Sequence, residues 1–133
     1  MFKVLSFAAV AIAAVSAAVV PRAAVPTTVG TVQTGGYATY YYQFGGYGAC
    51  GNINPDSAII VALQSARYDS SLCGHTVSIT NVNKGITIQA VVADNCPGCR
   101  NSESLDLSVG AWTAIGQSEA DGTGVPITWT LLN

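Results

Sequence analysis

Four cysteines constrain the fold of this 133-residue chain more than any other feature. They are Cys50, Cys73, Cys96 and Cys99, and the last two enclose a Pro-Gly dipeptide. An even number of cysteines behind a secretory signal predicts two disulfides, which suit a small domain whose core benefits from cross-links. A zinc site is the alternative for a Cys-x-x-Cys pair, but no second such pair is present, so we expect no metal. The residues alone leave three pairings open.

The chain begins with two segments that precede the expected domain. Lys3 and the apolar run of residues 4–15 are typical of a secretory signal, and the small residues 16–18 fit a cleavage site. A membrane anchor is the alternative, but the run is shorter than the roughly 20 residues that span a bilayer. We therefore expect a secreted, extracellular protein without a membrane partner. The expected divisions are a signal peptide at 1–18, a propeptide or linker at 19–34, and one domain at 35–133.

The expected domain is acidic and carries few charges. It contains all seven acidic residues of the chain but only three of its five basic residues, Arg67, Lys84 and Arg100. Because these three do not form a basic patch, nucleic acid and anionic polymers are disfavoured as partners. A neutral polymer suits this composition better, and we expect a monomer that needs no cofactor.

The sequence pattern is mostly that of β-strands. Strands are predicted at 37–44, 76–81, 86–93 and 125–132, where β-branched and aromatic residues are frequent. A turn at Asn83-Lys84-Gly85 joins the second and third of these strands into a hairpin. Trp129 alternates with polar residues in the last strand, and we expect it in the core.

Two helices are also predicted. Asn54 before Pro55 is typical of a helix start, with the cap residue followed by proline at the first helical position. Ser108 caps a second, short helix whose apolar stripe includes Trp112, which we expect to be buried. Four apolar residues follow Asn54-Pro55 at helical spacing: Ile59, Ile60, Leu63 and Ala66.

The order of several short motifs resembles the double-psi β-barrel superfamily, which includes expansin N-terminal domains, barwin, bacterial rare lipoprotein A and family 45 endoglucanases. Small secreted fungal members, called expansin-like proteins or loosenins, are the most similar. The resemblance implies a mainly β fold, a six-stranded double-psi β-barrel with short helices, over residues 35–133. The motifs are Ala38-Thr39-Tyr40-Tyr41, Gly48-Ala49-Cys50-Gly51, Cys73-Gly74, Val92-Ala93-Asp94 and Leu105-Asp106-Leu107-Ser108.

The resemblance also implies a site. It implies that three polar residues, Thr39, Asp94 and Asp106, cluster on one barrel face and bind substrate. Tyr40 and Tyr41 are further candidates for substrate binding; the tyrosines here alternate along the strand, so about half are expected in the core, and those that face outward can stack on sugar rings. Asp106 matches the acid of the glycan-cleaving relatives and is the candidate catalytic residue. Asp94 and Asp106 are expected to lie close enough for repulsion to raise one pKa. The alternative is structural, with Asp94 binding amides of the Cys96–Cys99 turn and Asp106 next to a helix start.

Several functions follow from the resemblance. The first is a secreted expansin-like protein that binds cell-wall polysaccharide, cellulose or chitin, and loosens it without hydrolysis. The alternative is an inhibitor of papain-type cysteine proteases, or a protein of plant–microbe interaction. A glycan-cleaving enzyme is less favoured, because the base carboxylate of family 45 is absent from residues 39–43, where Gln43 cannot accept a proton as a carboxylate does. The histidine of rare lipoprotein A matches Tyr68, not His75, the only histidine here.

The resemblance to barwin implies a disulfide pairing as well. Barwin pairs the cysteine equivalent to Cys50 with the one equivalent to Cys73. Cys96 and Cys99 would then close on each other across the Pro-Gly turn.

Overall fold

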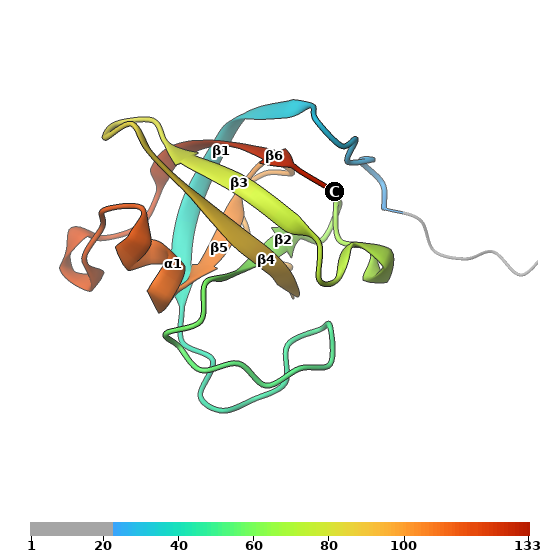
Figure 1. Cartoon of the computed structure of the whole chain (residues 1–133), viewed down its shortest axis with the longest axis horizontal. Helices are drawn as coiled ribbons and strands as arrows, with labels where there is room; N and C mark the ends of the chain where they lie inside the picture. Colours follow the sequence, from blue (N-terminus) through green and yellow to red (C-terminus); the bar gives the residue numbers. More distant parts are fainter. Residues whose placement is uncertain (1–22) are drawn as a thin grey trace, which may run out of the picture.

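The computed structural model describes residues 23–133, so the predicted signal peptide and residues 19–22 lie outside the described part of the chain. The described residues form a closed barrel of six strands with one short α-helix (Figure 1). The elements are β1 (Val32–Tyr41), β2 (Ile60–Gln64), η1 (Ser70–Leu72), β3 (Thr76–Asn81), β4 (Ile86–Cys96), β5 (Leu105–Ser108), α1 (Val109–Ala114), η2 (Glu119–Asp121) and β6 (Val125–Leu131).

The strand order around the barrel is β1-β5-β2-β4-β3-β6. The pairs β1/β5 and β2/β4 are parallel, and all other neighbours are antiparallel. Closure leaves no strand edge unpaired, which suits a small, mainly β domain. No helix among residues 23–133 is long and apolar enough to cross a membrane.

The hairpin, the last strand and the short helix agree with the sequence patterns. In β3 and β6 buried residues alternate with more exposed ones, as expected when one face of a strand covers the core. Ser108 caps α1, where its Oγ accepts a hydrogen bond from Ala111 N at 3.1 Å. Trp112 and Trp129 are both buried in the core, as predicted.

The helix predicted after Asn54-Pro55 is wrong. Residues 60–64 form β2, which pairs with β4 on one side and β5 on the other. Val61 and Leu63 face the core, whereas Ala62 is buried on the outer side of the strand. A strand buried on both faces is a continuous apolar run, and such a run fits helical spacing by chance.

The strands also differ from the prediction at β1, β4 and β5. β1 begins at Val32, ahead of the expected domain start at residue 35, and ends at Tyr41 instead of Phe44. The short strand β5 was not predicted, because its four residues are too few to show an alternation. The unpredicted β5 and the continuation of β4 to Cys96, beyond the predicted end at residue 93, place Asp106 and Asp94 on paired strands.

The disulfide pairing implied by barwin is confirmed. Cys50 bonds to Cys73, and Cys96 bonds to Cys99. The first disulfide ties the long loop between β1 and β2 to the segment that leads into β3. The second closes the end of β4 on itself.

A buried arginine fastens the segment before β1 to the barrel. The Arg67 side chain is only 4% exposed, and its Nη2 donates to Gln33 Oε1 at 2.7 Å and to Glu103 Oε1 at 3.0 Å. Its Nη1 donates to the Pro26 carbonyl oxygen at 3.1 Å, and its guanidinium lies 5.5 Å from the Trp129 ring centroid. One cation therefore joins segments that are far apart in the sequence.

We predict that Arg67→Ala lowers the free energy of unfolding by about 3 kcal/mol, because the substitution removes a buried side chain together with its hydrogen bonds to the Pro26 and Ser102 carbonyl oxygens and its ion pair with Glu103. Arg100→Ala is the control. Arg100 is exposed and lies 4.1 Å from the Tyr37 ring centroid, so its loss is expected to change stability by less than about 1 kcal/mol. Urea unfolding of both variants measures the difference, and equal effects would contradict this role of Arg67.

Candidate functional site

Four neighbouring strands place a row of side chains on the outer face of the barrel. Thr39 of β1 is in register with Asp106 of β5, and Ala62 of β2 is in register with both Asp106 and Asp94 of β4. We call Thr39, Asp106, Ala62 and Asp94 the polar row. The residues that flank Thr39, Ala62 and Asp106 on both or one side belong to the core cluster, so these three side chains face away from the core: Ala38, Val61, Leu63, Leu105 and Leu107.

A register shift between β2 and β4 brings Asp94 into the row. Val61 pairs with Val92, but Ala62 pairs with Asp94, so Ala93 is passed over. A bulge of this kind re-aims the side chains that follow it. Without the shift, Ala93 would lie opposite Ala62, and Asp94 would fall outside the row.

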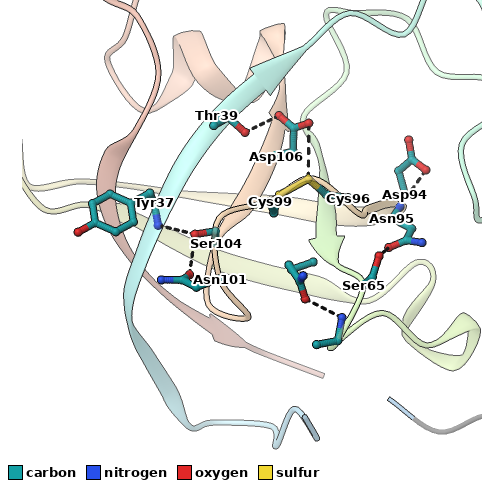
Figure 2. Close-up of a disulfide and its surroundings, with 12 residues drawn as sticks. Tyr37, Thr39, Ser65, Asp94, Asn95, Cys96, Cys99, Asn101, Ser104 and Asp106 are labelled. Atoms are coloured by element: carbon teal, nitrogen blue, oxygen red, sulfur yellow. Dashed lines mark hydrogen bonds between the residues drawn. A yellow bond between two sulfur atoms is a disulfide. The ribbon is translucent and has the colours of Figure 1, made fainter. Parts of the chain in front are cut away.

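Asp106 is the central polar group of the row. Its Oδ1 accepts a hydrogen bond from Thr39 Oγ1 at 2.8 Å, and the two side chains point toward one another in Figure 2. The Cys96 sulfur lies 3.9 Å from Asp106 Oδ2. Because Cys96 is in a disulfide, it carries no proton to donate, and this approach is a packing contact.

Burial raises the pKa of Asp106, and the charge of Asp94 raises it further, against the opposing effect of the Thr39 hydrogen bond. The expected rise is confirmed, but burial is its main cause. The two aspartates lie on strands separated by β2, so their main chains are about 10 Å apart, two interstrand spacings. Ala62 thus acts as a spacer that weakens the repulsion.

Asp94 also fastens the loop between β1 and β2. Its Oδ1 accepts hydrogen bonds from Ala49 N at 2.7 Å and from Asn95 N at 2.8 Å. Gly48 allows the close approach, because a Cβ there would lie 2.5 Å from the Ala93 carbonyl oxygen. The structural alternative for Asp94 is therefore correct in kind, but the amides belong to the loop and to Asn95, not to the Cys96–Cys99 turn.

Tyr41 faces the same side of β1 as Thr39. Its hydroxyl is buried and, among the described residues, has no hydrogen-bond partner of normal geometry. Burial, followed by the charges of Asp94, Asp106 and Asp56, raises the pKa of Tyr41 well above its usual range. Three carboxylates therefore lie near one phenol at this end of the barrel.

Tyr40 lies apart from the other predicted site residues. Side chains alternate along β1, so Tyr40 faces inward, where its ring centroid is 5.0 Å from that of Trp112. Its hydroxyl donates to the Glu119 carbonyl oxygen at 2.8 Å. The structure thus brings Thr39, Tyr41, Asp94 and Asp106 to one face and Tyr40 to the other.

Asp56 is a carboxylate that sequence reasoning missed. Its Oδ1 accepts a hydrogen bond from Gln43 N at 2.8 Å. Folding therefore brings a carboxylate next to residues 39–43, which contain no carboxylate of their own. The only signal was the Asn54-Pro55-Asp56 turn, which we interpreted as a helix start. His75 contributes nothing here, since its Nδ1 contacts the carbonyl oxygen of Asn133.

A hollow of about 180 Å³ lies beside the polar row. It is bounded by the end of β1, the loop that follows and Asp94. Its lining residues are Tyr41, Tyr42, Gln43, Gly46, Tyr47, Gly48 and Asp94. No group of three His, Cys, Asp or Glu side chains that could hold a metal occurs among residues 23–133.

A larger hollow of about 290 Å³ lies next to the segment before β1 and includes Pro26, Arg67 and Asp69. None of the polar row lines it, and its arginine is fully engaged with protein acceptors. We therefore place the candidate site at the smaller hollow, where Asp94 of the polar row meets the aromatic rings.

Neither protein-family models nor curated protein sequences match this chain, but solved structures do. An expansin of Clavibacter michiganensis, solved as a mutant in complex with cellohexaose, has a TM-score of 0.64 and 31% sequence identity; the match covers 77% of this chain and 51% of that chain. The apo form of this expansin gives the same values. A Streptomyces papain inhibitor has a TM-score of 0.63 and 29% identity, over 80% of this chain and 99% of the inhibitor.

The fold is that of the expansin-like double-psi barrels. The predicted fold class, a mainly β six-stranded barrel with little helix, is thus confirmed. The chain spans about half the length of the expansin and almost the whole length of the papain inhibitor. One neighbour was solved with a glucan oligosaccharide, and the other is a protease inhibitor, so the fold alone does not choose between these partners.

The raised pKa of Asp106 has a measurable consequence for stability. A folded-state pKa above the unfolded value of about 3.9 means that ionisation of Asp106 destabilises the fold. We predict that Asp106→Asn is more stable than wild type at neutral pH. The gain should shrink as pH falls through the raised pKa and disappear below about pH 3.9.

Asp69→Asn is the control of opposite sign. A hydrogen bond from the Ser71 backbone lowers the pKa of Asp69, so its ionised form stabilises the fold at neutral pH. Thermal unfolding between pH 3 and pH 8 compares the variants, and the same pH trend in both would show that burial of Asp106 is not the cause.

Proposed function

We propose that this protein is a small secreted expansin-like protein of the loosenin type. It binds a neutral cell-wall polysaccharide, cellulose or chitin, and loosens contacts between chains without hydrolysis. The observation that carries the proposal is the polar row, with Asp106 and Asp94 on the outer face of the barrel beside an aromatic-walled hollow. Secretion, with residues 1–18 as signal peptide and 19–34 as propeptide or linker, is part of the proposal and accords with the two disulfides.

The chemistry of the site favours an uncharged glycan. Three carboxylates, Asp56, Asp94 and Asp106, lie around the Tyr41 hydroxyl and would repel an anionic polymer. Sugar hydroxyls can donate to such carboxylates, and the apolar faces of sugar rings can lie on tyrosine rings. A neutral polysaccharide satisfies both kinds of group.

Asp106 supplies the proposed loosening step. Because burial raises its pKa, a larger fraction of Asp106 is protonated in mildly acidic surroundings than of an exposed aspartate. The protonated carboxyl can donate a hydrogen bond to a glycan oxygen while Oδ1 still accepts from Thr39. That bond replaces one between neighbouring glycan chains, so no covalent step is needed.

Hydrolysis is not part of the proposal. A glycan-cleaving enzyme of the inverting kind needs a base carboxylate to activate water opposite its acid. Asp94 and Asp56 are the nearest carboxylates that we identify, and both accept hydrogen bonds from backbone amides that hold the loop. We propose that these two aspartates shape the site and take no part in a reaction.

The second candidate function is inhibition of a papain-type cysteine protease. The observation in its favour is the match to the Streptomyces papain inhibitor over 99% of the inhibitor's length. Such a role, or another one in plant–microbe interaction, would use the same barrel as a protein-binding module.

We predict that Asp106→Ala abolishes the loosening of filter paper or cotton by this protein, because alanine can neither donate a hydrogen bond to the glycan nor accept one from Thr39. Asp106→Asn should keep part of the loosening, since its amide can donate to the glycan while its oxygen accepts from Thr39. Asp121→Ala is the matched control, since this exposed aspartate lies on η2, outside the polar row, and should leave loosening intact. Loosening by Asp106→Ala at the wild-type level would overturn the role of Asp106.

Two further measurements separate the alternatives. Reducing sugar released from β-glucan at the rate of an endoglucanase, and lost in both Asp106→Asn and Asp56→Asn, would show that the protein is a hydrolase. Papain inhibition without binding to cellulose or chitin would make the protease the partner. We expect neither result.

A further inference from the structure

The loop between β1 and β2 carries large apolar side chains on its surface. We call residues 42–53 the aromatic loop; in Figure 1 it hangs below the barrel. Phe44 is 89% exposed and Tyr47 is 77% exposed, and Tyr42 and Ile53 are exposed as well. Such a group of exposed large side chains on one loop of a small domain indicates a contact surface.

The aromatic loop is fastened at several points. Ala49 N donates to Asp94, and Cys50 is bonded to Cys73. Within the loop, Tyr47 and Ile53 form an isolated β-bridge. The rings are therefore presented in a defined arrangement before a partner binds, which lowers the entropic penalty of binding.

Phe44 has a backbone conformation that is uncommon for its type. Its φ is 51°, in the left-handed region that a bulky residue rarely adopts. The next residue, Gly45, also has a positive φ, of 68°. Strain of this kind persists where the surroundings hold it, and here it accompanies the most exposed large hydrophobic side chain of those described.

The chemistry and position of the loop point to one partner. Residues 42–53 contain no charged side chain, so the loop offers rings and amides to a ligand. Tyr42 and Tyr47 line the same hollow as Asp94, and the ring centroids of Tyr42 and Phe44 are 5.8 Å apart. The loop is thus continuous with the candidate site.

We propose that the aromatic loop is a stacking platform for the sugar rings of an uncharged polysaccharide, with Phe44 and Tyr47 as its main contacts. The platform extends the binding site beyond the polar row and holds the polymer while Asp106 acts on it. This inference rests on the proposed function and names a surface that adds to the polymer affinity of the site.

The test is binding of the full-length secreted protein to microcrystalline cellulose and to chitin. The double variant Phe44→Ala/Tyr47→Ala should bind about tenfold more weakly, because two ring contacts of ordinary strength correspond to that factor. Phe44→Trp should keep the affinity, whereas Phe44→Leu, which keeps an apolar side chain without a ring, should reduce it. Val82→Ala is the control, since Val82 is exposed but lies outside the loop.

The outcomes separate this inference from the proposed function. If wild type binds the polymer and the double variant binds it equally well, the platform is overturned and the proposed function still stands. Binding that is equally strong in Phe44→Leu overturns ring stacking. If wild type binds neither polymer but inhibits papain, and the double variant loses inhibition, both proposals fail and the loop is a protease contact. Equal thermal midpoints of wild type and variants exclude misfolding as the cause.

Discussion

The pairing of β2 with β4, shifted after Val61, decides what this barrel presents on its outer face. The core needs only that Val61, Leu63 and Val92 face inward, and that requirement is met before and after the shift. What the shift changes is the side chain that lies next to Ala62. By passing over Ala93, it places a carboxylate there, in line with Asp106 across one small residue. A bulge in β4 thus adds a second carboxylate to the outer face of the sheet.

Asp94 couples this site to the loop that covers it. One of its oxygens binds the backbone of Ala49, and Gly48 lets the loop come close enough for that bond. The disulfide from Cys50 fixes the same loop to the opposite side of β4, at the segment before β3. The aromatic side chains and the carboxylates are therefore held by shared contacts, so a change at Asp94 would alter both. Asp106, whose hydrogen bond is to Thr39 on a regular strand, is the better position at which to separate chemistry from structure.

Sequence patterns predicted those parts of the structure that show up as a periodic alternation of residues or as a fixed order of motifs. β3 and β6 alternate in burial, Ser108 caps its helix, and the motif order pointed to the barrel and to both disulfides. β2 was mistaken for part of a helix because it is buried on both faces and has no period of two. Asp56 could not be found, because only the path of the loop brings it to Gln43. The tyrosines were expected to alternate between the core and the surface, but only the register of β1 shows that Tyr40 is one of those that face inward.

The electrostatic setting of Asp106 argues against a purely structural role. The one salt bridge among residues 23–133 joins Arg67 to Glu103, so no cation compensates the half-buried Asp106 carboxylate. Within the described part of the chain, Thr39 Oγ1 is the only polar group that donates to Asp106, and a neutral side chain at position 106 could accept the same hydrogen bond. Burial of a carboxylate without a counter-charge disfavours its ionised form and so reduces stability at neutral pH. Asp106 therefore lowers stability at a position where a neutral side chain would serve the fold as well. Its presence is best explained by a hydrogen bond that its carboxyl proton donates to a ligand.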